Sequence, residues 1–224
     1  MSTNVTATVI GLVIALFGPM LLAIAGERFV SLQSRFALHV LAMGGYLAIV
    51  ASVLFIVFHY ERQSLLSIGV RPFGWQTIAW GLALAAFFMY AFAPAAYWAL
   101  ARFNLGSFDL GLAKSAGLPV WYLTIAVIFG GIAEELLYRG YAIERIATLT
   151  GSYWLAGAIS VVIFGLAHVP VWGWGPALTT VVSGAAATAF YIWQRDLVAI
   201  IVAHVITDFA GIVVMPYLAR TKWL

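Results

Sequence analysis

The sequence predicts an all-α fold: a polytopic membrane helix bundle that forms a single domain. Of its 224 residues, 64% are hydrophobic and only 8% are charged, and the mean hydropathy is +1.04. An average soluble domain is about 45–50% apolar and about 25% charged. A soluble fold of this length has too little interior to bury so much apolar surface, so lipid is the solvent that fits. Because a spanning helix takes about 20 residues, the length allows about seven transmembrane helices with short loops.

Seven apolar stretches fit that count, and polar or glycine- and proline-rich segments separate them. The segment from residue 102 to 119 is the longest predicted loop. We treat residues 1–224 as one integral membrane domain, in which 1–118 hold the N-terminal spans and 119–219 hold a core rich in ionisable groups. The predicted spans are residues 5–25, 36–58, 75–100, 120–138, 154–169, 176–193 and 197–218.

Charge and cysteine content exclude several classes of protein. The net charge of +3 is small and the basic residues are scattered, so no nucleic-acid-binding patch is expected. Basic residues at span ends typically contact lipid headgroups, which makes membrane lipid an expected partner. The chain has no cysteine, which excludes disulfides, thiol catalysis and cysteine-ligated zinc.

Ionisable residues are nearly absent from the first three spans and recur in the last four. A charge inside the bilayer costs at least about 2.5–3.5 kcal/mol, so such residues normally face a cavity and have partners. The first group is Glu134, Glu135 and Arg139, placed at the end of the fourth span. Glu135 and Arg139 are i,i+4 neighbours and are expected to pair, whereas Glu134 is turned about 100° away and stays free for proton chemistry. The alternative is that both glutamates cap the span at the headgroup level.

The second group is Phe164 and His168, at the end of the fifth span. Phe164 lies at i−4 and is expected to pack against the His168 ring. A neutral imidazole can hold a water or ligate a metal. Taken alone, this histidine is also explained as an interfacial residue.

The third group is His204 and Asp208, in the middle of the last span, where they share one helix face. The alternative for this pair is a buried hydrogen bond that fixes helix packing. Helix bundles build sites from inward-facing side chains on neighbouring helices, so the three groups together predict one site.

These motifs resemble those of the CAAX protease and bacteriocin-processing family, also called the Abi family, of intramembrane endopeptidases. The family pattern is EExxxR, then FxxxH, then HxxxN or HxxxD on successive helices. The resemblance covers about residues 120–218, and the first three spans lie outside it. It implies a multi-pass protease of a membrane-associated protein or peptide, prenylated or not, and we expect a bacterial or archaeal cell membrane.

The resemblance also implies a role for each matching residue. Glu134 is the expected general base, and His168 helps to hold the attacking water. His204 donates to the oxyanion, and Glu135 and Arg139 form the supporting ion pair.

Asp208 stands where the prenyl-protein proteases have asparagine. An amide can donate to an oxyanion, but an ionised carboxylate repels it. Asp208 is therefore protonated, orients His204 or ligates a metal. No cofactor is required in the preferred interpretation. If a divalent metal such as zinc is used instead, its ligands are expected among Glu134, His168, His204 and Asp208.

Two other classes of function stay open at this stage. The first is a non-catalytic protein on the same scaffold, acting in bacteriocin immunity or as a membrane partner. The second is a proton-coupled transporter, since intramembrane acids and histidines also form proton relays. The absence of a visible internal repeat argues against the transporter.

Overall fold

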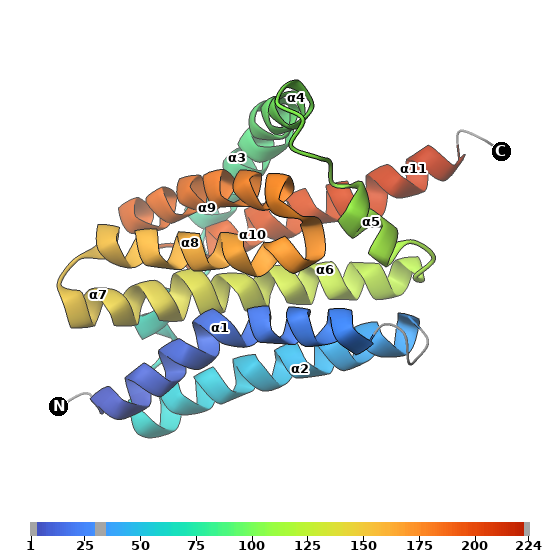
Figure 1. Cartoon of the computed structure of the whole chain (residues 1–224). Helices are drawn as coiled ribbons and strands as arrows, with labels where there is room; N and C mark the ends of the chain where they lie inside the picture. Colours follow the sequence, from blue (N-terminus) through green and yellow to red (C-terminus); the bar gives the residue numbers. More distant parts are fainter. Residues whose placement is uncertain (1–3, 30–34, 222–224) are drawn as a thin grey trace.

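The computed structural model describes residues 4–29 and 35–221, and in these residues it is helical throughout, with short connections (Figure 1). Among these described residues, seven helical stretches are long and apolar enough to cross a membrane. The elements are α1 (Val5–Phe29), α2 (Arg35–Phe55), η1 (Ile56–Tyr60), η2 (Leu65–Ile68), α3 (Trp75–Phe87), η3 (Phe88–Phe92), α4 (Ala93–Arg102), α5 (Asp109–Ser115), α6 (Val120–Glu134), η4 (Glu135–Ile143), α7 (Glu144–Thr150), α8 (Tyr153–Trp172), α9 (Trp174–Gln194), α10 (Leu197–Asp208), η5 (Phe209–Val214) and α11 (Met215–Thr221).

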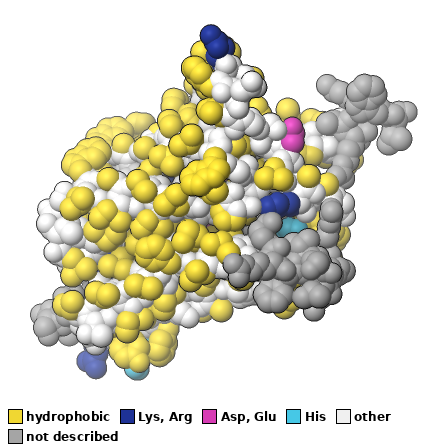
Figure 2. Space-filling model, viewed as in Figure 1, with side chains coloured by type: hydrophobic (Ala, Val, Ile, Leu, Met, Phe, Trp, Pro, Cys, Tyr) yellow, Lys and Arg dark blue, Asp and Glu magenta, His cyan; other side chains and the backbone are white. Residues whose placement is uncertain are grey.

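The membrane helix bundle predicted from composition is confirmed, and the surface agrees with it. Figure 2 shows apolar side chains spread over the flank of the bundle, with few charged side chains on the same face. Large apolar residues remain exposed on most of the spanning helices, as in Leu21, Leu41 and Val182. Such a surface is expected of helices that face lipid chains.

The fourth span differs from its prediction. The expected helix ended at Tyr138, but α6, η4 and α7 form one continuous span, Val120–Thr150. The polar residues that suggested an end at the headgroup level are instead buried and paired inside the bundle. Glu135 and Arg139 pair with each other, and Arg145 pairs with Glu61. Once its charges are neutralised by partners, the helix can continue through the bundle.

This long span lies at the centre of the bundle. It contacts α1 and α2 on one side, and α8 and α10 on others. Its middle part, η4, is a π-helical segment and holds some of the most buried large side chains of the protein, among them Tyr138, Arg139 and Tyr141. The Glu134–Glu135 motif therefore lies at the middle of a span.

The two ends of the bundle differ, and we name them after helices labelled in Figure 1. At the α5 end, the short helix α5 packs against the last turn of α8, where Lys114 Nζ donates to the Pro170 carbonyl at 2.8 Å. Helices α8 and α9 turn back there through one residue, Gly173, before they reach the level of the first turn of α6 (Figure 1). At the α7 end, Glu144 pairs with Arg195 and accepts a hydrogen bond from Tyr191.

Candidate active site

Glu135 belongs to a buried ion network. Its Oε1 lies 3.1 Å from Arg139 Nη1, and both side chains are only 2% exposed. The Arg139 guanidinium also lies over the Phe164 ring, 4.1 Å from its centroid. Gly184 on α9 leaves room for this guanidinium, because a Cβ there would lie 3.0 Å from Arg139 Nη2. The predicted Glu135–Arg139 pair is therefore present and fully desolvated.

The same oxygen of Glu135 also holds His204. The distance from His204 Nδ1 to Glu135 Oε1 is 2.7 Å, so the ring nitrogen donates to the carboxylate. On the other side of the ring, Nε2 lies 3.3 Å from Asp208 Oδ2. Both nitrogens of His204 thus face carboxylate oxygens, and a ring with hydrogens on both nitrogens satisfies both contacts.

Glu134 has different surroundings from Glu135. Its Oε2 lies 3.9 Å from His168 Nε2 and 3.8 Å from His204 Nε2, too far for direct hydrogen bonds. Its Oε1 accepts a hydrogen bond from the Tyr46 hydroxyl at 3.4 Å. The side chain is 20% exposed, against 2% for Glu135. One carboxylate is therefore tied to arginine, and the other faces two histidines.

His168 is fixed by its own helix. Its Nδ1 lies 2.8 Å from the Phe164 carbonyl, and because a carbonyl only accepts, Nδ1 carries the hydrogen. The Phe164 and His168 rings pack edge to face, 4.5 Å between centroids, as the motif spacing predicts. In the neutral ring, Nε2 then has a free lone pair, and this atom faces Glu134.

The six residues singled out in the sequence form one chain of contacts. Arg139, Glu135, His204 and Asp208 follow one another at 3.1, 2.7 and 3.3 Å, and Glu134 lies between His204 and His168. They come from the continuous α6–η4 helix, from α8 and from α10, which are distant in sequence and adjacent in space. The structure brings the three motifs together, and the role of each residue in a site stays a prediction.

Tyr46 on α2 is the site contact that the sequence did not predict. It lies in an apolar span with no ionisable neighbour, and tyrosines are common in membrane helices. No local pattern distinguishes it from a lipid-facing tyrosine. The structure gives the second span, at least, a direct contact with the site.

The acidic and histidine side chains do not form a metal site in this arrangement. Within residues 4–29 and 35–221, no group of three or more His, Cys, Asp or Glu residues could hold a metal ion. The interpretation without a metal stays a prediction.

Comparison with known families gives an independent result. Residues 116–210 match the family described as Type II CAAX prenyl endopeptidase Rce1-like. The Rce1-like segment contains all six candidate residues, and the resemblance predicted from the three motifs is confirmed. The match indicates an intramembrane endopeptidase of the CAAX protease type. No curated protein and no solved structure matches the chain.

Proposed function

We propose that this protein hydrolyses a peptide bond of a membrane-associated protein or peptide by means of a water activated between Glu134 and His168. The observation that carries the proposal is the position of Glu134 Oε2, which faces His168 Nε2 at 3.9 Å and His204 Nε2 at 3.8 Å. These gaps are too long for direct bonds and suit a small reacting group held between the three side chains.

The first step is removal of a proton from water. A carboxylate and the lone pair of a neutral imidazole are both acceptors, so one water can donate to Glu134 and His168 together. The hydrogen bond from Tyr46 to Oε1 leaves Oε2 directed to this position. Glu134 takes the proton while the water oxygen attacks the carbonyl carbon of the scissile bond.

The second step is stabilisation of the negative oxygen that forms. His204 is the donor best placed for it, because Nε2 points toward Glu134 and its ring is held at Nδ1 by Glu135. A donor held in place before the reaction stabilises an oxyanion without costly reorganisation. When the intermediate collapses, Glu134 returns its proton to the leaving amine, and the peptide bond breaks.

Asp208 acts through His204 in this proposal. Its carboxylate lies 3.3 Å from Nε2 and favours the ring form that carries a hydrogen on that nitrogen. It is the most exposed of these groups, at 39%, so an oxyanion can displace it from the Nε2 hydrogen. In this proposal Asp208 orients His204, and His204 donates to the oxyanion in place of an asparagine amide. Glu135 and Arg139 are the supporting pair that keeps the ring in position.

The test is a comparison of protein N-termini in native membranes that hold equal amounts of wild-type protein or the Glu134→Gln variant. Peptide termini that depend on Glu134 are expected only with the wild type. The control is Asp109→Asn, which changes an exposed carboxylate on α5 that accepts a hydrogen bond from the Ser107 hydroxyl. Cleavage at the wild-type rate by a folded Glu134→Gln protein would contradict the proposal.

The same experiment addresses the alternative of a non-catalytic immunity or partner protein. That function predicts identical termini in both membranes and protection that survives Glu134→Gln. Purified protein with matched peptides, one carrying a prenylated cysteine and one not, then tests the substrate class that the family description names. A bacterial or archaeal cell membrane is our proposed location.

A further inference from the structure

Ser160 on α8 donates a hydrogen bond to the backbone of the central span. Its hydroxyl lies 2.6 Å from the Tyr138 carbonyl, and the side chain is only 1% exposed. Hydroxyls in helices often bond to a carbonyl of their own helix, as those of Ser52, Thr124 and Thr207 do here. The Ser160 bond instead joins two helices, so it fixes where α8 lies against η4.

The Tyr138 carbonyl lies in the part of the span that carries the buried ion pair. It belongs to the peptide group that joins Tyr138 to Arg139, within the π-helical segment η4 that begins at Glu135. A shift of this peptide group would move the Arg139 side chain relative to Glu135. Glu135 in turn holds His204 at 2.7 Å. The position of the carbonyl therefore bears on side chains that Ser160 does not bond.

Three positions on α8, spaced four residues apart, contact the central span in order. The Ser160 hydroxyl bonds to Tyr138, and the Phe164 ring packs against the Tyr138 ring with 4.9 Å between centroids. One turn further, His168 Nε2 faces Glu134 Oε2 at 3.9 Å. The helices run antiparallel, so the contacts move back along the span as α8 advances (Figure 1).

The Ser160 bond is the directional contact of this series. Packed rings can slide over one another by a fraction of an ångström, and the gap between His168 and Glu134 is too long for a direct bond. A hydrogen bond to a backbone carbonyl loses strength when its length or angle changes. The register of α8 against η4 therefore depends on Ser160 more than on the other two contacts.

We propose that Ser160 is a positioning residue, whose hydrogen bond to the Tyr138 carbonyl sets the separation of His168 from Glu134. This inference rests on the function proposed above. Without the hydroxyl, a buried carbonyl loses a donor that water cannot readily replace, and the two helices shift. A displacement of about 1 Å between reacting groups can lower a rate about 100-fold.

The experiment compares purified full-length wild type, Ser160→Ala and Ser160→Cys by steady-state kinetics on a peptide that the wild type cleaves and Glu134→Gln does not. Ser160→Ala should lower kcat about tenfold to 100-fold with KM unchanged, because substrate still binds while the reacting groups are displaced. Cysteine is similar in size and is a weak donor, so Ser160→Cys should give a kcat between the two. Thermal unfolding measures the folded fraction, and kcat is expressed per folded protein.

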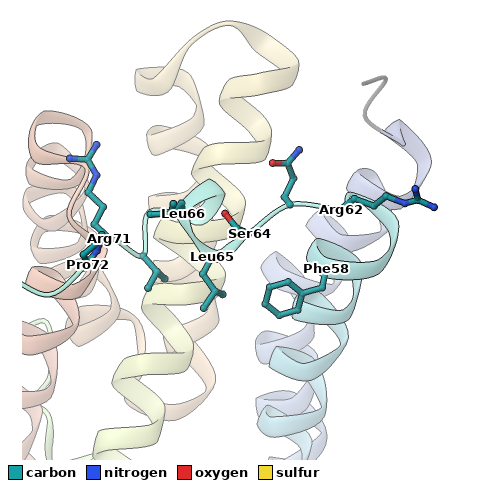
Figure 3. A pocket seen from close by; sticks show the side chains of 9 residues that line it. Phe58, Arg62, Ser64, Leu65, Leu66, Arg71 and Pro72 are labelled. Carbon is teal, nitrogen blue, oxygen red and sulfur yellow. The ribbon is translucent and has the colours of Figure 1, made fainter.

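Two control variants should keep the wild-type kcat. Tyr153→Phe removes the 3.2 Å hydrogen bond from Tyr153 to Glu144, which also joins α8 to the central span but lies at the α7 end. Ser64→Ala makes the same change as Ser160→Ala at an exposed serine on the segment between η1 and η2 (Figure 3). An equal fall in kcat for Ser160→Ala and Tyr153→Phe would contradict a specific role of Ser160.

The other outcomes separate this inference from the proposed function. A serine that only stabilises the fold predicts lower unfolding temperatures for both Ser160 variants with the wild-type kcat, and that result overturns the positioning role alone. If Ser160→Ala does not fold, Ser160→Cys decides by the same criterion. If the wild type cleaves no peptide faster than Glu134→Gln does, the proposed function is wrong and the role of Ser160 is wrong with it.

Discussion

Two adjacent glutamates in α6 and η4 have different surroundings, and the chemistry that we propose for the site depends on that difference. Glu135 is shared by Arg139 and His204, whereas Glu134 accepts a hydrogen bond from Tyr46 and faces His168 and His204 across longer gaps. This division follows from sequence, because i,i+4 spacing pairs Glu135 with Arg139 and directs Glu134 elsewhere. Tyr46 could not be predicted, since its contact depends on how α2 packs against α6.

Replacement of Glu135 tests whether it orients His204 or only neutralises Arg139. Glu135→Gln leaves a buried arginine without a counter-charge, which is expected to cost about 3–5 kcal/mol of unfolding free energy. The double variant Glu135→Gln/Arg139→Met removes both charges and should regain most of that stability. Its cleavage rate should stay at least about 100-fold below wild type, because His204 loses its ionic partner.

Thermal unfolding and kcat, measured on the same preparations, separate the two roles. Near-wild-type cleavage by the double variant would contradict the orienting role. It would leave Glu135 and Arg139 as a structural pair.

Tyr46→Phe tests the contact from the second span. The substitution removes one hydrogen bond to Glu134 and keeps the ring, so kcat should fall about fivefold to tenfold with KM unchanged. Tyr90→Phe is the control, because Tyr90 is 79% exposed on η3. Steady-state kinetics on a cleaved peptide provide the measurement. An equal fall in both variants, or a change in KM alone, would argue against positioning of the base.

At the level of elements, π-helical segments follow directly after two of the candidate site residues. Glu134 is the last residue of α6 before η4, and Asp208 is the last residue of α10 before η5. A π turn contains one residue more than an α turn, so it changes the direction in which the side chains beyond it point. Such turns are frequent at functional sites. Predictions from hydrophobic periodicity assume a constant number of residues per helical turn, so these π-helical segments could not be predicted from the sequence.

The spans themselves were largely predictable, because length and apolar composition decide them. The end of the fourth span was not, since the sequence does not show that Arg145 meets Glu61 from 84 positions away. A charged run signals an interface only when its charges lack partners. Partners on distant helices are visible in the structure alone.

Close packing of α8 against α9 depends on Gly165. A Cβ at this position would lie 2.2 Å from Val181 Cγ2, so Gly165→Ala should force the helices apart and lower the unfolding free energy by about 1–3 kcal/mol. Gly130 on α6 has nothing within 4 Å of the point that a Cβ would occupy, and Gly130→Ala is the matched control, expected to be neutral or slightly stabilising. Thermal unfolding in detergent compares the two. Equal stability of both variants would contradict the packing argument.

For the whole molecule, the central question is whether the assembled site needs a metal. The proposed mechanism uses only side chains and water, so EDTA and 1,10-phenanthroline should leave the cleavage rate of purified protein unchanged. A loss of activity that Zn²⁺ restores would contradict this and would reassign His168 and Glu134 as ligands. The same assay with the Glu134→Gln protein gives the background rate.

The charge pairs of the central span also bear on the order in which the chain is made and assembled. Glu135 finds Arg139 within its own helix, and Arg145 finds Glu61 in a part synthesised earlier. Glu144 pairs with Arg195, 51 residues later, after α8 and α9. During synthesis this span therefore leaves the ribosome with Glu144 unpaired in addition to the free Glu134, and Glu144 gains its partner only when Arg195, which follows the sixth span, has been made. If the span entered lipid before that, the Glu144 carboxylate would face the membrane interior without a partner.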